Sequence, residues 1–212
     1  MAGTTRQRLI RREAPGLLMA LLGFAAVSPA RATTSDSAED TRGAGTYVSK
    51  IAAEVMGLAN GGGSKDALRP KFVAILNKYI NIRGIANFAL GQYQSKLTGA
   101  EKEKFYSLFS NYAASLFVAY VADFRGSDLK ITSITRQGNF TTITSAIVSK
   151  GGGREQVKWR LALTGGASRV SDVNVKGVWL SIATKKRFGD VLKQSGGDLD
   201  VLFAELKKAD TW

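Results

Sequence analysis

The chain has 212 residues, with 30 lysines and arginines against 17 aspartates and glutamates, and it contains neither cysteine nor histidine. Without these two residue types there is no disulfide, no cysteine nucleophile and no histidine general base, and the commonest zinc ligands are missing. The composition therefore favours a binding protein over an enzyme, and we expect no cofactor and no metal.

The first 32 residues are predicted to be an export signal. Four arginines precede a short apolar run over residues 16–27, and Ala30-Arg31-Ala32 forms a small-x-small cleavage site. The run is too short to span a bilayer and is followed by a processing site, so we expect it to be removed rather than to anchor the protein. The protein is then expected to work outside the cytoplasm.

Removal of this segment changes the charge balance. Five arginines and Glu13 lie within it, which leaves 25 basic and 16 acidic residues, or a net charge of +9, on the following 180 residues. An exported protein rarely meets nucleic acid, so anionic lipid headgroups are the expected counterpart. The alternative is a basic surface that serves solubility alone.

The next part of the chain is predicted to be helical. Residues 33–45 form a polar tail that we expect to be flexible, and a single domain is expected over residues 46–208. One helix carries an apolar stripe that ends at the glycines 61–63. A second helix follows, with Pro70 expected in its first turn, where proline is tolerated. A shorter third helix is expected to end at Gly91.

The longest predicted helix begins at a capping box and runs to about Phe124. Thr98 and Glu101 have the spacing in which each side chain bonds the other residue's backbone N–H. Apolar residues cover most of the helix circumference, so the helix is expected to be buried on several sides.

A strand-rich part follows, with segments over residues 128–137, 140–150, 155–164 and 169–177 that are rich in β-branched residues. Short glycine-containing segments separate them, which is typical of hairpins. Val178–Ile182 is a candidate extension, and two helices are predicted to close the chain. The predicted fold class is α+β: a curved antiparallel sheet of four to five strands, with helices packed on its apolar face.

The order of residues from Pro70 to Leu206 resembles the MlaC family, also called the toluene-tolerance auxiliary family. The segments that carry the resemblance are "FVAILNKYINIRGIANFALGQYQSKLTGAEKEKFYSLF", "VKWRLAL", "VSDVNVKGVWL" and "KKRFGDVLKQSGGDLDVLFAEL". The chain departs from the family pattern at Asn81, Tyr93, Ser168-Arg169 and Trp179, which stand where Asp, Trp, Trp-Lys and Ser are usual.

The resemblance implies a periplasmic lipid-binding shuttle that carries phospholipid between the outer and inner membranes as the soluble component of an ABC-type lipid transport system. It also implies a diacyl phospholipid ligand in a deep pocket between sheet and helices. The expected protein partners are the substrate-binding subunit of an inner-membrane ABC transporter and an outer-membrane lipoprotein complex, with the protein itself a monomer that binds no nucleic acid.

Thirteen apolar and aromatic residues on the predicted helices and strands are candidates for the pocket lining. They are Phe72, Ile75, Leu76, Tyr79, Phe105, Phe109, Tyr112, Leu116, Ile131, Trp159, Leu161, Val173 and Val175. Each is also compatible with an ordinary place in the core. Lys185, Lys186 and Arg187 are candidates for the pocket mouth or, alternatively, for a solvated helix end.

Three other functions are kept as alternatives. Because hopanoid-associated proteins share the domain, the lipid could be polycyclic. A lipid-free adaptor that docks on a membrane complex is the second alternative. The third is a small exported enzyme with a cone-shaped pocket, in which Asp172 would act as a base.

Overall fold

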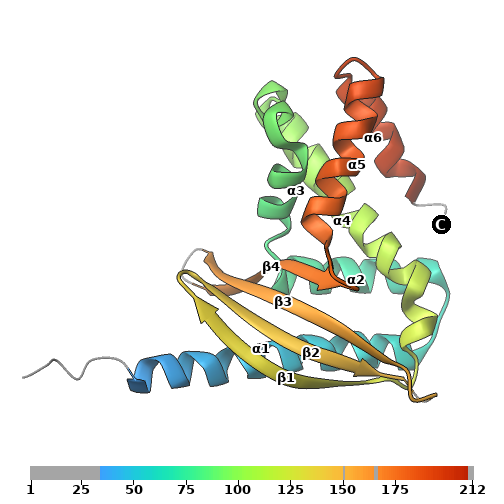
Figure 1. Ribbon diagram of the computed structural model, residues 1–212. Helices are drawn as coiled ribbons and strands as arrows, with labels where there is room; N and C mark the ends of the chain where they lie inside the picture. Colours follow the sequence, from blue (N-terminus) through green and yellow to red (C-terminus); the bar gives the residue numbers. More distant parts are fainter. Residues whose placement is uncertain (1–33, 150, 165–166, 210–212) are drawn as a thin grey trace, which may run out of the picture. The chain divides into compact units, whose positions relative to one another are not determined.

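The computed structural model describes residues 34–149, 151–164 and 167–209 (Figure 1). The side chains of residues 34–41, 122 and 123 are also left out of the description. The predicted signal segment and its cleavage site lie outside the described residues.

Within these ranges the chain forms six α-helices, two 3₁₀ helices and five strands. The helices are α1 (Thr34–Gly61), α2 (Lys65–Tyr79), α3 (Ile82–Leu90), η1 (Gly91–Lys96), α4 (Gly99–Tyr120), η2 (Val121–Phe124), α5 (Leu180–Gln194) and α6 (Leu199–Lys208). The strands are β1 (Asp128–Gln137), β2 (Phe140–Val148), β3 (Arg154–Thr164), β4 (Ala167–Val175) and β5 (Val178–Trp179). The predicted α+β class with an antiparallel sheet is confirmed.

The sheet is a meander in which each strand pairs antiparallel with the next, in the order β1-β2-β3-β4-β5. Ile143 of β2 pairs with Trp159 of β3, which pairs with Val173 of β4, so these side chains point to one face. We call this the inner face of the sheet. Figure 1 shows α1 and α2 behind the sheet, and α1 contacts β1 and β2. Alternating residues such as Lys158 and Arg160 point to the opposite face, as the sequence pattern predicts.

Helix α1 begins much earlier than the sequence predicts. The expected polar tail over residues 33–45 is helical from Thr34 onward. The apolar stripe starts only at Ala44, which packs on the hydrophobic core. Once a helix has formed, each further residue that is ordered adds one hydrogen bond, so extension is easier than nucleation. Ala38, Glu39 and Arg42 are also residue types that favour a helix. The polar composition of residues 34–45 was therefore not evidence that the segment lacks a helix.

Helix α2 also begins earlier, which places Pro70 in its second turn rather than the first. Ser64 is the N-cap, and its hydroxyl accepts a hydrogen bond from Ala67 N at 3.2 Å. The helix therefore starts at Lys65, and Pro70 cannot donate to the Asp66 carbonyl one turn back. The prediction that Pro70 lies in the first turn is wrong because the capping serine was not recognised.

The capping box at the start of α4 is confirmed. Glu101 N donates to Thr98 Oγ1 at 3.3 Å, and Thr98 N donates to Glu101 Oε2 at 2.8 Å. The helix ends at Tyr120 and continues as the 3₁₀ helix η2 to Phe124, which is the predicted end.

The hydrophobic core divides into two clusters that share α4. The first, which we call the sheet cluster, lies between the inner face of the sheet and α1, α2 and the C-terminal half of α4. Its buried members are Val48, Ile51, Ala59, Leu68, Phe72, Ile75, Tyr79, Ile80, Ala114, Val118, Val121, Ile143, Leu161 and Val170.

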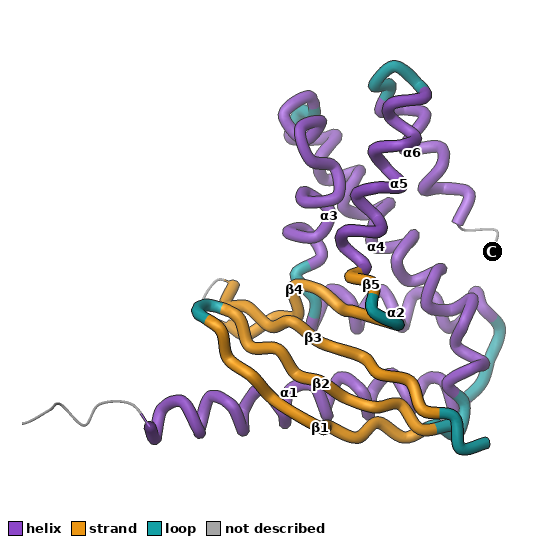
Figure 2. Tube along the Cα trace, viewed as in Figure 1, coloured by secondary structure: helices purple, strands orange, loops and turns teal. Residues whose placement is uncertain are grey.

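The second cluster, which we call the helix cluster, joins α3, η1, α5 and α6 to the N-terminal half of α4. Its buried members are Ala86, Ala89, Leu90, Leu97, Phe105, Phe109, Tyr112, Phe188, Leu192, Leu202, Phe203, Leu206 and Ala209. Figure 2 shows α5 and α6 beside α4, with the start of α5 next to the short strand β5. The prediction that the helices pack on the apolar face of the sheet therefore holds for α1, α2 and half of α4. The two closing helices pack mainly on other helices.

Candidate functional site

The two clusters separate the thirteen residues that the sequence places in the pocket. Eight of them belong to the sheet cluster or pack against it: Phe72, Ile75, Leu76, Tyr79, Ile131, Trp159, Leu161 and Val173. Four belong to the helix cluster or pack against it: Phe105, Phe109, Tyr112 and Leu116. Val175 pairs with Val157 near the end of β4 and lies in neither cluster. The structure thus brings eight candidates together and places the others elsewhere.

The helix cluster is built as a tightly interlocked aromatic core. The Phe188 ring lies within 5.9–6.3 Å, centroid to centroid, of the rings of Phe105, Phe109 and Tyr112. Phe203 stacks on Phe105 at 6.1 Å. These rings are 0–4% exposed, and aromatic pairs at this distance contribute beyond their buried area. Insertion of an acyl chain would have to break these contacts.

The sheet cluster is less completely buried. Thirteen further hydrophobic residues pack against it while they are only partly buried. They include Tyr47, Leu58, Leu76, Phe117, Phe124, Ile131, Ile134, Trp159 and Val173. Apolar contacts of this kind are non-directional, so an acyl chain can replace them at small cost. The sheet cluster is therefore the better candidate for a site that opens.

A buried serine orients the largest side chain of the inner face. The Trp159 indole N–H donates to Ser145 Oγ at 2.9 Å, and Ser145 Oγ donates to the Val157 carbonyl at 3.2 Å. Ser145 is 0% exposed. Both polar groups are thus satisfied inside an apolar surface, which holds the indole ring against the sheet.

Hydrogen bonds join α2 firmly to β4 at one edge of the sheet cluster. Asn81 N donates to the Val170 carbonyl at 2.8 Å. The Arg169 guanidinium donates to the carbonyls of Asn77 and Lys78 at 3.0 and 3.1 Å, at the C-terminal end of α2. The two bonds from Arg169 satisfy carbonyls that the end of α2 leaves unpaired.

Polar contacts also join α1 to α2. The Tyr79 hydroxyl and the Lys78 ammonium both donate to Glu54 Oε1, at 2.5 and 2.9 Å, and the Tyr47 hydroxyl donates to the Tyr79 carbonyl. The hydrogen bonds from Tyr79 and Lys78 lower the pKa of Glu54 below its ordinary value. Helices α1 and α2 therefore form one unit over the sheet.

At the opposite edge of the sheet cluster, α1 approaches two apolar side chains of β1. A Cβ atom at Gly45 would lie 2.9 Å from Ile134 Cδ1 and 3.7 Å from Ile131 Cδ1. Glycine thus allows the helix backbone to approach the strand.

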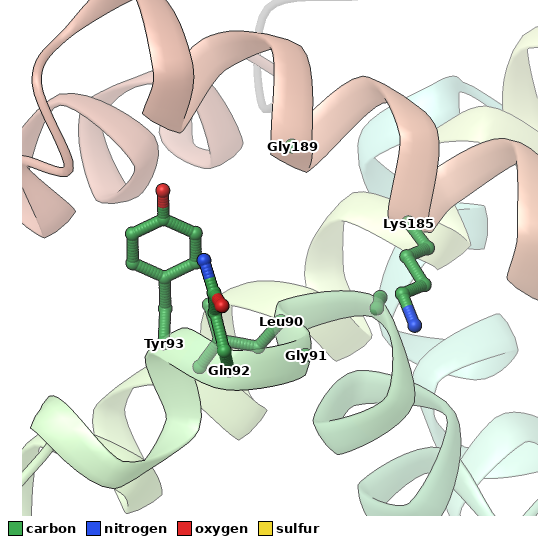
Figure 3. A pocket seen from close by; sticks show the side chains of 7 residues that line it. Leu90, Gly91, Gln92, Tyr93, Lys185 and Gly189 are labelled. Carbon is green, nitrogen blue, oxygen red and sulfur yellow. The ribbon is translucent and has the colours of Figure 1, made fainter.

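Two small hollows are present at other places on the described surface. One, of about 340 Å³, lies between α3, η1 and α5, where Tyr93 and Gln92 point toward α5 (Figure 3). The other, also of about 340 Å³, includes Thr132, Arg154 and Gln156 on the sheet. None of the thirteen candidates lines either hollow. Their volume is at the lower end of the range for drug-sized ligands, about 300–1,000 Å³.

The three cationic candidates for a pocket mouth all lie on α5. Lys185 lines the hollow beside α3, with its ammonium 4.5 Å from the centroid of the Phe88 ring. Lys186 pairs with Asp190 at 2.7 Å, and Arg187 pairs with Glu205 at 2.9 Å. They lie on the helix-cluster side of the protein, so they do not flank the eight candidates of the sheet cluster.

Asp172 has a structural place that accounts for its burial. Its carboxylate accepts hydrogen bonds from Val173 N at 2.9 Å, Ser181 N at 3.1 Å and Ser181 Oγ at 2.5 Å. Ser181 N lies in the first turn of α5, whose N-cap residue Trp179 offers no side-chain hydrogen bond. Asp172 thus caps α5 from the neighbouring strand. The alternative in which Asp172 is a catalytic base receives no support from these contacts.

No group of three or more acidic, cysteine or histidine side chains that would hold a metal ion occurs among the described residues. Within the same ranges, no helix combines the length and apolar character that a membrane span requires.

Comparison with known proteins identifies the family. The family model described as "MlaC protein" matches residues 49–208. The chain belongs to the MlaC family. A search of curated proteins gave no match.

Among solved structures, the fold is similar to the phospholipid-binding protein from Ralstonia solanacearum, which was solved in complex with a phospholipid. The two share 18% sequence identity with a TM-score of 0.66, over 78% of this chain and 96% of that chain. At this identity the likeness shows a shared fold, and the resemblance to the MlaC family inferred from the sequence is confirmed by the family match.

The sheet cluster also contains residues that the sequence analysis did not select, for a reason visible in the strand register. Ile143 follows the same alternation as Trp159 and could have been found from it. Ile134 follows a β-bulge between Ile131 and Ser133 of β1. Val170 precedes a bulge in β4, opposite Arg160 and Leu161. A bulge inserts a residue and reverses the phase of alternation, so strict alternation assigns both residues to the wrong face.

Proposed function

We propose that this member of the MlaC family is a lipid-binding protein, and that it works as a periplasmic shuttle for phospholipid between the outer and inner membranes. Membership of the family, over residues 49–208, is the observation that carries the proposal. The phospholipid in the complex of the Ralstonia solanacearum protein, which shares the fold, supports the class of ligand. The proposal is for a binding protein rather than an enzyme.

The lipid pocket is proposed to form within the sheet cluster. A buried CH₂ group contributes about 0.8 kcal/mol, so an acyl chain of about fifteen carbons costs on the order of 12 kcal/mol to expose to water. A carrier must therefore offer an apolar surface along the whole chain. The inner face of the sheet and the facing sides of α1 and α2 provide such a surface, and eight of the thirteen candidate residues lie there.

The edge at which the pocket would open follows from how the two sides of the cluster are joined. At the β4 edge, opening would break the hydrogen bonds of Asn81 and Arg169, which leaves backbone groups unpaired. At the β1 edge, the α1 backbone at Gly45 approaches the apolar side chains of Ile131 and Ile134. An acyl chain can replace such contacts with equivalent ones, so we propose that lipid enters between α1 and β1.

The test is the lipid content of protein purified without detergent from the soluble fraction of cells. Extraction with chloroform and methanol followed by mass spectrometry is expected to give close to one diacyl phospholipid per protein. A hopanoid in its place would identify a polycyclic cargo, and lipid far below stoichiometric amounts would contradict the carrier function and favour a lipid-free adaptor.

The remaining parts of the proposal concern the cellular context. We propose that the mature protein is a periplasmic monomer that begins after Ala32 and comprises one lipid-binding domain over residues 46–208. Its protein partners would be the substrate-binding subunit of an inner-membrane ABC transporter and an outer-membrane lipoprotein complex. The resemblance to the family supports these assignments.

A further inference from the structure

The segment Lys176–Arg187, which we call the β5–α5 segment, combines exposed apolar side chains with uniform positive charge. Its sequence, KGVWLSIATKKR, contains four basic residues and no acidic residue. Val178, Leu180 and Ile182 are 52%, 47% and 56% exposed. Large apolar side chains scattered singly over a surface are ordinary, but three within five consecutive residues make this segment an apolar patch that calls for a partner.

The local structure requires these side chains to point outward. Ser181, between Leu180 and Ile182, is turned inward by its two hydrogen bonds to Asp172. Further along α5, Phe188 and Leu192 are 1% exposed within the helix cluster. Because these contacts determine the rotation of α5 about its axis, Leu180 and Ile182 cannot turn into the core. Figure 2 shows β5 and the start of α5 next to β4.

Arg160, Trp179 and Phe140 extend the patch onto the face of the sheet opposite the inner face. The Arg160 guanidinium lies 4.0 Å from the ring centroid of Trp179 and 5.7 Å from that of Phe140, which is 47% exposed. Tryptophan and cationic side chains with long apolar stems are favoured at the boundary between hydrocarbon and water, where one end is apolar and the other hydrated.

Lys176 is held in a conformation that is unfavourable for lysine. It has φ of +52°, and it is the one non-glycine residue with positive φ in the part of the chain that the structure describes. Lys176 and Gly177, with φ of +84°, connect Val175 to its partner Val178. Positive φ at both central residues is a type I′ hairpin turn, in which asparagine or glycine is preferred at the first position. The strained turn thus places a cationic side chain that is 77% exposed at the tip of the segment.

We infer that the β5–α5 segment docks the protein on a membrane surface that contains anionic lipid. Its three exposed apolar side chains would enter the headgroup region, while Lys176, Lys185 and Lys186 would meet the anionic headgroups. Lys176 is paired with Glu155 at 3.7 Å and Lys186 with Asp190 at 2.7 Å, but the two lysine side chains are 77% and 78% exposed. Such surface pairs open at little cost.

Charge favours a bilayer over a protein as the occupant. The uniform sign of the segment agrees with the net charge of +9 on residues 33–212, and an anionic leaflet is complementary to both. The inference goes beyond the proposed function, because a protein can hold a lipid in a pocket without touching a bilayer.

The test is co-sedimentation with vesicles of phosphatidylcholine alone or of phosphatidylcholine mixed with phosphatidylglycerol. Protein from the soluble fraction is expected to bind the anionic vesicles about tenfold more strongly or better, since each lysine near an anionic surface contributes about fivefold. The preference should be largely lost at about 0.5 M salt, where the screening length is short.

Two variants test the segment itself. Leu180→Ser/Ile182→Ser removes exposed apolar area and should weaken vesicle binding about tenfold, with little effect on the melting temperature. The matched control is Val201→Ser, since Val201 is 44% exposed on α6 and should leave binding unchanged. Lys176→Asn should weaken binding about fivefold while it raises the melting temperature, because asparagine suits the turn. Weaker vesicle binding together with a higher melting temperature would show that the variant has lost a contact with the membrane and has not unfolded.

Equal binding to both kinds of vesicle would overturn the inference. Full vesicle binding by the double variant would also overturn it, and would indicate that a protein surface covers the patch. The lipid content of the same variants keeps this result separate from the proposed function. Variants that no longer bind vesicles but still carry lipid would show that docking and carriage use different surfaces, as inferred.

Discussion

Enlarging one buried alanine in each cluster should distinguish a site that opens from a core that does not. Ala114 on α4 belongs to the sheet cluster, Ala86 on α3 belongs to the helix cluster, and both are 0% exposed. Ala114→Leu and Ala86→Leu add the same three carbons at equally buried positions. The two variants therefore differ in the surroundings of the added atoms and not in chemistry.

The expected magnitudes follow from packing. In a core that cannot move, added carbons force neighbours out of their preferred positions, at a cost of about 1–3 kcal/mol. For a domain of this size that lowers the melting temperature by roughly 2–4 °C per kcal/mol. The interlocked rings around Phe188 make this the expected result for Ala86→Leu. Where the surroundings can separate, burial of the three carbons contributes about 2.4 kcal/mol, which offsets most of the cost.

The assay compares the melting temperature of delipidated protein with the lipid content of protein purified without detergent. We expect Ala114→Leu to melt close to the parent protein and to carry less phospholipid, because leucine occupies space that an acyl chain needs. Ala86→Leu should melt several degrees lower and carry lipid as before. A large drop in melting temperature for Ala114→Leu with unchanged lipid content would show that the sheet cluster is ordinary core and would refute the proposed pocket.

Four further predictions concern stability and processing. Thr98→Ala removes the capping box of α4 and should cost about 0.5–2 kcal/mol in urea unfolding, whereas Thr98→Ser should retain most of this stability. Ser115 is 2% exposed and its hydroxyl has no hydrogen-bond partner among the described residues. Ser115→Ala should therefore stabilise the protein by about 1 kcal/mol, and a lower melting temperature would contradict this prediction. The pKa of Glu54 is lowered in the folded protein by hydrogen bonds from Tyr79 and Lys78. The contribution of Glu54 to stability is therefore present above its pKa in the unfolded chain and is lost as the pH falls through the lowered value. The free energy of unfolding should fall on acidification below about pH 4, and it should fall less steeply for Glu54→Gln. Intact-mass measurement of protein released from the periplasm should give a chain that begins at Thr33, and a retained Met1 would contradict the predicted signal segment.

Features set by neighbouring residues were predictable from the sequence. The capping box of Thr98 and Glu101 depends on two side chains three positions apart. The strands follow from alternation and from the glycines between them, and β1 agrees with its predicted range of 128–137. The same kind of reasoning failed at α2, where Ser64 was not recognised as an N-cap, and at α1, where polar composition did not prevent a helix.

Only the tertiary structure decided which apolar surfaces meet. An apolar stripe shows that one face of a helix is buried, but it does not identify the partner: Phe105 and Phe109 of α4 face Phe188 and Phe203, whereas Ala114 and Val118 on the same helix face the sheet cluster. For this reason twelve of the thirteen pocket candidates, all of which are apolar or aromatic, divide between the two clusters, and Val175 lies in neither. The β-bulges that bring Ile134 and Val170 to the inner face are set by the pairing of whole strands. The exposure of Leu180 and Ile182 likewise depends on the bonds between Ser181 and Asp172, nine residues away, because contacts between separate elements determine how each helix is rotated against its neighbours.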